Sequence, residues 1–157
     1  MTTHAVSPAS TARLGRVVRI LGIFVAAAGL IMTIAGAATW FTVQGQLADE
    51  KITVSEDAGW LAGDEINGPF SAYQEAQVIE KHALAASGGK TYAELDKADP
   101  KRETVMNGSF LRASLFTSVV SFGVATMAAG VGVLLALVGY ALFLVSRQLS
   151  ALGTTEA

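Results

Sequence analysis

Two histidines are the side chains of this sequence best suited to acid–base or metal chemistry, and they stand far apart. His4 lies in the N-terminal tail, and His82 lies in a helix-prone segment near the middle of the chain. Helical metal sites often pair a histidine with a second ligand one turn away, as in Glu-x-x-His. Glu75 and Glu80 precede His82 by seven and two residues, so neither has this spacing. The sequence therefore predicts no catalytic residue, no metal site and no cofactor.

Adjacent carboxylates occur three times in the polar middle of the chain, at Asp49-Glu50, Glu56-Asp57 and Asp64-Glu65. Such pairs could bind a cation or a basic partner, but on a water-facing loop they usually serve solubility. Cysteine is absent, which excludes disulfides, thiolate metal sites and cysteine nucleophiles. The formal net charge of −2 offers no basic field for phosphate groups, so we predict no nucleic-acid partner.

The element that follows the N-terminal tail is an uncharged run of 24 residues from Ile20 to Val43. About 20 apolar residues are enough for a helix to cross the roughly 30 Å of hydrocarbon in a bilayer. We therefore predict that residues 20–43 form a first transmembrane helix. The residues flanking or closing this run are expected to anchor it at the membrane interfaces, namely Arg13, Arg16, Arg19, Trp40 and Phe41.

A second uncharged run covers the 34 residues from Ala113 to Ser146. A helix of this length would measure roughly 50 Å, which exceeds the hydrocarbon thickness, so part of it must project. We predict that residues 119–144 are embedded, because serines and threonines make the earlier turns more polar. The expected interface anchors of this helix are Arg112, Tyr140 and Arg147.

The charges outside the two runs predict the orientation in the membrane. Residues 1–19 carry three arginines and no acid, and residues 147–157 carry Arg147 and Glu156. Both tails are expected in the cytoplasm, because short cytoplasmic segments are enriched in Lys and Arg. Residues 44–112 hold 12 acids and 7 bases and form the expected extracytoplasmic loop. We predict a multi-pass protein of the cell membrane.

Two alternatives compete with this topology. The first run could be a cleaved signal peptide, with Ala35-Gly36-Ala37 as the cleavage site. An uncleaved anchor is favoured, because the apolar run is longer than a signal-peptide core and continues past this site into Trp40 and Phe41. Two buried helices of a soluble protein are disfavoured, since little amphipathic sequence remains to cover them.

Start and stop signals predict that the extracytoplasmic loop is mostly helical. After a β-prone patch at residues 52–54 and a turn at Asn67-Gly68-Pro69, Ser71 and Gln74 form a capping-box pattern. A helix over residues 72–86 should follow and end at Gly88-Gly89. Its apolar stripe is expected to contain Ala72, Ala76, Ile79, Ala83 and Ala86.

The end of the loop carries signals for two further helical segments. Thr91 and Glu94 form a second capping box, and Asp99-Pro100 starts a helix that has no stop signal before the membrane. This helix is expected to continue into the second span, since Gly108 weakens it without breaking it. The predicted fold class is an all-α membrane protein, a two-helix transmembrane hairpin with a mostly helical extracytoplasmic loop.

Small residues on both spans predict close helix packing. Gly29 and Thr33 on the first span and Ala128, Gly132 and Ala136 on the second follow the small-x-x-x-small pattern. The contact could form within the chain or between copies of it. The cores of the spans carry no ionisable residue, which argues against transport by this chain alone. A pore lined by serines and threonines of an oligomer remains an alternative.

Four motifs carry a resemblance to a known family. They are Gly68-Pro-Phe-Ser-Ala-Tyr73, Lys81-His-Ala-Leu84, Ser87-Gly-Gly-Lys-Thr-Tyr-Ala-Glu-Leu95 and the stretch Met106-Asn-Gly-Ser-Phe-Leu-Arg-Ala-Ser-Leu-Phe-Thr-Ser-Val-Val120. On these motifs the sequence, over about residues 14–146, resembles a family of small actinobacterial two-span membrane proteins often labelled aromatic ring-opening dioxygenase LigA. The label implies a dioxygenase component with a ferrous site of two histidines and a carboxylate.

The residues themselves favour a role without catalysis. With His82 as the one histidine on the loop, the two-histidine ferrous site is not expected. We predict an integral membrane protein whose partners are the lipid bilayer and either further copies of itself or a larger membrane complex, in which it is an accessory subunit. The alternatives are a dioxygenase component and a small oligomeric channel.

Overall fold

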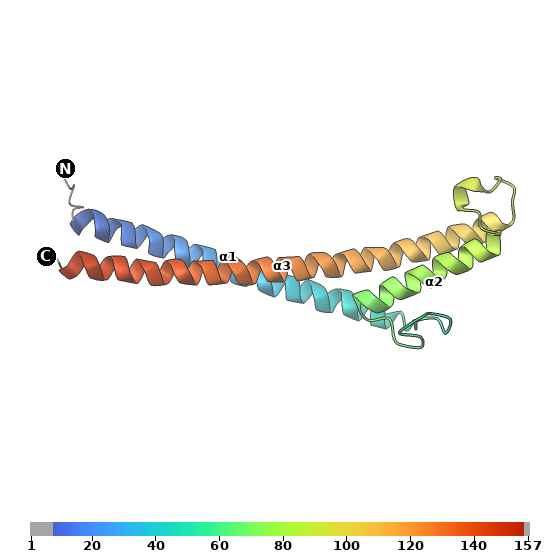
Figure 1. Ribbon diagram of the computed structural model, residues 1–157, viewed down its shortest axis with the longest axis horizontal. Helices are drawn as coiled ribbons and strands as arrows, with labels where there is room; N and C mark the ends of the chain where they lie inside the picture. The colour runs from blue at the N-terminus through green and yellow to red at the C-terminus, as the bar shows by residue number, and fades with distance from the viewer. Residues whose placement is uncertain (1–7, 156–157) are drawn as a thin grey trace. The chain divides into compact units, whose positions relative to one another are not determined.

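The computed structural model describes residues 8–155, and long helices dominate this part of the chain (Figure 1). Helix α1 covers Pro8–Asp49, α2 covers Pro69–Ser87, and α3 covers Lys101–Thr155, with a short 3-10 helix, η1, at Tyr92–Glu94. Within the described residues there is no strand, only an isolated antiparallel bridge between Thr53 and Glu65. The prediction of an all-helical fold is therefore confirmed.

The chain divides into two compact units, and the boundaries fall inside α1 and α3. Unit 1 contains residues 1–37 and 127–157, and unit 2 contains residues 38–126. Unit 1 is built from the first part of α1 and the last part of α3. Unit 2 holds the remaining parts of these two helices together with α2, η1 and the connecting loops.

Two of the helices are long and apolar enough to cross a membrane. The segments that qualify are Ser10–Asp49 and Lys101–Ala151. Only 11% of the most apolar stretch of each is buried within the protein, so most of its side chains face outward. The core helix of a soluble protein would instead bury its apolar residues. This pattern is consistent with a membrane location.

Both long helices extend beyond the uncharged runs. Helix α1 begins at Pro8, so Arg13, Arg16 and Arg19 lie on the helix and not in an irregular tail. Helix α3 begins next to Pro100, where the Asp99 Oδ1 atom accepts a hydrogen bond from the Lys101 backbone N–H at 2.9 Å. The prediction that one helix runs from the Asp99-Pro100 signal through Gly108 into the second uncharged run is confirmed.

The ends of α2 follow the sequence signals with one correction. Gly68, not Ser71, is the N-cap, and the helix begins at Pro69. A proline preset for helical φ starts the helix earlier, so Ser71 occupies the third helical position, where its Oγ atom accepts a hydrogen bond from the Gly68 N–H at 3.3 Å. The predicted stop is confirmed, with φ of 74° at Gly88 and 86° at Gly89, values that favour glycine.

The core of unit 2 lies between α2, the loop before it and the adjacent parts of α1 and α3. Its buried members are Leu47, Val54, Ile66, Ala72, Ala76, Leu115 and Phe122. Of the predicted stripe on α2, Ala72 and Ala76 are buried, Ile79 and Ala83 are partly buried, and Ala86 is exposed. The stripe fails at Ala86 because the last turn of α2 buries Ser87, whose Oγ atom donates to the Leu84 and Lys90 carbonyl oxygens.

The second capping box is also confirmed. A Glu94 carboxylate oxygen accepts hydrogen bonds from the Thr91 N–H at 2.8 Å and from the Thr91 hydroxyl at 2.7 Å. These bonds stabilise the charged carboxylate and lower the pKa of Glu94 below its usual value, with the backbone N–H as the larger cause. Arg102 on α3 then donates to the Tyr92 and Leu95 carbonyl oxygens and holds η1 against α3.

Candidate functional site

Two reciprocal pairs of glycines form the contact between α1 and α3 in unit 1. A Cβ atom built on Gly29 would lie 2.5 Å from the Gly132 carbonyl oxygen, and one on Gly132 would lie 2.6 Å from the Gly29 oxygen. The pair of Gly22 and Gly139 behaves in the same way, at 2.9 and 2.6 Å. Real Cβ atoms essentially never approach another atom this closely. The two backbones can therefore take this separation only where both positions are glycine.

The glycines of this contact recur every seven residues. On α1 the buried positions of unit 1 are Gly15, Gly22, Gly29 and Gly36, and on α3 they include Gly132, Gly139 and Ser146. Seven residues correspond to almost two turns of helix, so each repeat returns to the same face. We call this face the glycine seam. The contact loosens toward Gly15, where a Cβ would be 3.0 Å from Ser150 Oγ and 3.4 Å from the Ser146 carbonyl oxygen.

The structure brings together four of the five residues that the sequence suggested for helix packing. Thr33 Oγ1 donates to the Gly29 carbonyl oxygen at 2.9 Å and would lie 2.5 Å from a Cβ on Gly132. A Cβ on Gly29 would also meet the backbone nitrogen of Ala136. Ala128, the fifth, is partly buried. Gly22 and Gly139 were not among the residues predicted for helix packing, although both lie on the seven-residue spacing of glycines.

The expected interface anchors have unequal surroundings. In unit 1, Arg13, Arg16, Tyr140 and Arg147 are exposed, and the Arg19 guanidinium lies 5.7 Å from the centre of the Phe143 ring. In unit 2, Phe41 is exposed, but Trp40 turns inward and packs edge-on against Phe122 with 4.7 Å between ring centres. An adjacent pair on a helix points in two directions, so Phe41 is exposed while Trp40 is only partly exposed.

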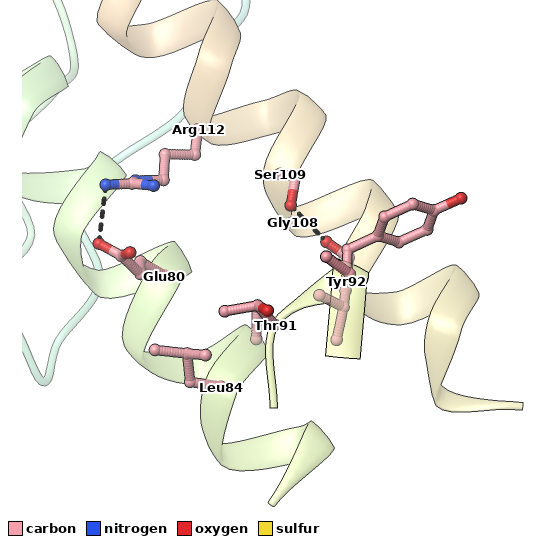
Figure 2. Close-up of a pocket in the computed structure, with 10 residues that line it drawn as sticks. Glu80, Leu84, Thr91, Tyr92, Gly108, Ser109 and Arg112 are labelled. Carbon is pink, nitrogen blue, oxygen red and sulfur yellow. Dashed lines mark hydrogen bonds and ion pairs between the residues drawn. The ribbon is translucent and has the colours of Figure 1, made fainter. Parts of the chain in front are cut away.

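Arg112 has a different partner from the one expected of an interface anchor. In unit 2 its guanidinium forms an ion pair with Glu80 of α2 at 2.9 Å and lies 5.2 Å from the centre of the Phe116 ring. Figure 2 shows this side chain crossing from α3 to Glu80. The ion pair ties α2 to α3. Gly108 supports the same contact, since a Cβ there would lie 2.9 Å from the Ala83 Cβ.

A cavity of about 320 Å³ lies beside this ion pair, between α2, η1 and α3 (Figure 2). Its lining includes Glu80, Leu84, Thr91, Val105 and Arg112. The Arg112 Nε atom is buried and has no hydrogen-bond partner in the described part of the chain. The one carboxylate of this lining, Glu80, is the partner of Arg112 in the ion pair.

His82 belongs to a charged cluster on the surface of unit 2. Lys81 Nζ and His82 Nε2 lie 2.8 and 3.0 Å from the same carboxylate oxygen of Asp57. These contacts, with the Lys81 hydrogen bond as the largest cause, lower the pKa of Asp57 from 3.8 to about 2. Together with the bonds from the Ser55 N–H and Oγ to Glu75, at 2.7 and 2.9 Å, they fasten the loop to α2.

The described residues do not fit the ferrous site that the family label implies. Between residues 8 and 155 no three or more His, Cys, Asp or Glu side chains gather in a way that could hold a metal ion. His82 is engaged with Asp57, and His4 lies outside the described residues. The geometry therefore provides no step through a metal.

Comparison with known proteins adds no assignment: no family model, no curated protein and no solved structure matches this chain.

Proposed function

We propose that the chain is a non-catalytic, two-span membrane protein that acts as an accessory subunit of a larger membrane complex. In this proposal α1 and α3 cross the bilayer, residues 44–112 form an extracytoplasmic cap, and both tails are cytoplasmic. The lipid bilayer is its first partner, and a second membrane protein is the other.

The glycine seam is the observation that carries the membrane part of the proposal. The small residues of unit 1 face each other, and the large apolar ones face outward. Those exposed on this unit include Ile20, Phe24, Leu30, Ile31, Ile34, Leu134 and Leu137. This distribution suits lipid as the surrounding solvent, because helix association in a bilayer depends on close backbone packing and not on burial of large apolar side chains.

Two exposed apolar residues on α3 support a protein partner for the cap. Phe110 and Leu111 lie before residue 119, where the embedded segment is expected to begin, and 65% of Phe110 is exposed. Beside them the chain carries a folded core and an ion pair, so this surface is held in one shape. An exposed apolar pair on a rigid helix outside the bilayer fits the buried centre of a protein interface.

Affinity purification of the full chain in a mild detergent tests the accessory role. We expect the chain to migrate with one defined set of membrane proteins, which reciprocal purification recovers. The double variant Phe110→Gln, Leu111→Gln should lose them, whereas Lys101→Gln should retain them, because Lys101 is exposed and lies nine residues before Phe110, on the opposite side of the same helix. A pure monomer, or an assembly of this chain alone, would contradict the accessory role.

A further inference from the structure

Three exposed aromatic side chains gather on unit 2 at the start of α2. Trp60 is 52% exposed, Phe70 is 69% exposed and Tyr73 is 45% exposed. The Trp60 and Phe70 ring centres are 6.3 Å apart, and Tyr73 meets Phe116 of α3 edge-on at 5.7 Å. Phe70 and Tyr73 are three residues apart on the same helix and therefore share a face. We call these three residues the aromatic anchor.

The register of α2 against α3 gives the level of the aromatic anchor along α3. Tyr73 contacts Phe116, Glu80 pairs with Arg112, and Gly108 approaches Ala83. As the numbers rise along α2 they fall along α3, so the two helices run antiparallel within unit 2. Phe70 precedes Tyr73 by about one turn and thus lies level with the turn of α3 that follows Phe116, at about residues 119–120.

This level coincides with the polar-to-apolar boundary of α3. Ser114, Thr117 and Ser118 precede it, and an almost wholly apolar sequence follows Val119. Tryptophan and tyrosine concentrate at membrane interfaces, because an apolar ring with a polar edge suits the region between headgroups and acyl chains. Phe70, which lies about one turn closer to this boundary than Tyr73, has no polar edge and suits the upper acyl chains.

The charges around the aromatic anchor indicate which lipid surface it meets. Glu56, Asp57, Asp64 and Glu65 flank Trp60 in the loop. Because these side chains are acidic, the loop is not attracted electrostatically to an anionic lipid surface. Contact with lipid must therefore come from the aromatic rings.

We propose that the aromatic anchor inserts into the outer interface of a zwitterionic phospholipid bilayer and seats the cap on the membrane. This inference rests on the proposed function, since it requires α1 and α3 to cross the bilayer. The anchor adds contacts from the loop and α2 to those made by the long helices.

Tryptophan fluorescence of the full chain in phosphatidylcholine vesicles tests the inference. The chain has two tryptophans, Trp40 and Trp60, so Trp40→Phe leaves Trp60 as the only reporter. We expect blue-shifted Trp60 emission, quenched more by lipids brominated near the headgroup than by lipids brominated near the chain end, and quenched weakly by aqueous acrylamide. Emission typical of water, with strong acrylamide quenching and none by bromolipid, overturns the inference and leaves the patch to a protein partner.

The complementary variant separates this inference from the proposed function. Trp60→Phe leaves Trp40, which packs on Phe122 in the expected span. Quenching of Trp40 by bromolipid without quenching of Trp60 rejects the aromatic anchor alone. No bromolipid quenching of either tryptophan rejects the membrane-spanning role as well.

A second pair of variants tests the depth assigned to Phe70. In the Trp40→Phe background, Phe70→Gln should reduce quenching of Trp60 by bromolipid, because a polar side chain replaces the ring that neighbours Trp60 and lies at the apolar boundary. Phe110→Gln is the matched control, since Phe110 is 65% exposed but lies nine residues before Val119 on α3. Equal effects of the two variants contradict the depth assigned to the aromatic anchor.

Discussion

At the scale of single residues, the charged side chains of unit 2 form ion pairs that hold its segments together. His82, the histidine most suited to chemistry, and Lys81 share the Asp57 carboxylate. Arg112 pairs with Glu80 and lies against Phe116. Both ties join segments distant in sequence, so neither could be derived from the spacing of charges along one helix.

The contacts of Asp57 with Lys81 and His82 predict that the stability of the folded chain depends on pH. The pKa of Asp57 is about 2 in the folded chain, below the ordinary 3.8. Its stabilising contribution is therefore present above pH 3.8 and is lost as the pH falls toward about 2, where the folded carboxylate takes up its proton. Carbon-13 NMR of the Asp57 carboxyl group should give this low midpoint.

Lys81 is the first cause of that low pKa, so Lys81→Met should raise the Asp57 midpoint toward 3.8. Lys97→Met, which removes an exposed lysine from a different loop, should leave it unchanged. A midpoint near 3.8 in the unaltered chain would show that the tie does not form in solution.

At the scale of elements, the glycine seam decides how α1 and α3 pack in unit 1. Small residues on the two spans were predicted to support packing within the chain or between copies, and the structure uses them within the chain. This leaves the large apolar side chains on the outer faces of the two helices.

Two alanine substitutions two residues apart on α3 should have opposite effects. Gly132→Ala places a Cβ 2.6 Å from the Gly29 carbonyl oxygen and should destabilise the helix pair by about 1–3 kcal/mol, the usual effect of overpacking. At Gly130 a Cβ meets nothing within 4 Å, so Gly130→Ala should be neutral or stabilise by up to about 1 kcal/mol through helix propensity.

Equilibrium unfolding of the purified chain in detergent, followed by circular dichroism, measures both variants. The same sign of change for Gly132→Ala and Gly130→Ala would contradict the assignment of Gly132 to the glycine seam. A loss of stability in Gly22→Ala, comparable with that in Gly132→Ala, would extend the result to the second glycine pair.

At the scale of the whole molecule, unit 1 supports the proposed orientation of the two ends of the chain. Gly15 lies beside Ser150, and Arg19 lies beside Phe143, so the arginine-bearing start of α1 is next to the end of α3. The three arginines of α1 and Arg147 of α3 therefore share one end of this unit. A concentration of arginine at one end of two spans favours the cytoplasmic side.

Single-cysteine labelling tests this topology, and the absence of native cysteine makes it direct. Ala12→Cys, Ala62→Cys and Gln148→Cys place a thiol at three exposed positions. On intact cells a membrane-impermeant maleimide should label only Ala62→Cys, and after permeabilisation it should label all three. Labelling of Ala12→Cys or Gln148→Cys on intact cells contradicts cytoplasmic termini, and release of the chain by alkaline carbonate contradicts a spanning protein.

The sequence by itself determined the helical elements and those ends that a local signal marks, whereas α1 and α3 extend beyond the uncharged runs. Uncharged runs, the Gly88-Gly89 stop, the Thr91–Glu94 box and the Asp99-Pro100 start depend on neighbours within a few residues, so their effects can be derived without a fold. For α2 the predicted N-cap was Ser71 and the observed N-cap is Gly68. This difference is small, because the residue that sets the observed start, Pro69, is also a local signal.

Only the tertiary structure decided which side chains meet. These contacts depend on the register between helices far apart in sequence. They include Gly22 with Gly139, Trp40 with Phe122, and Arg112 with Glu80. The register between two helices is the one at which their whole faces pack best. For α1 and α3 in unit 1, the glycines set this register because they let the two backbones approach closely. Within unit 2, the register of α2 against α3 brings the aromatic anchor level with the apolar boundary of α3.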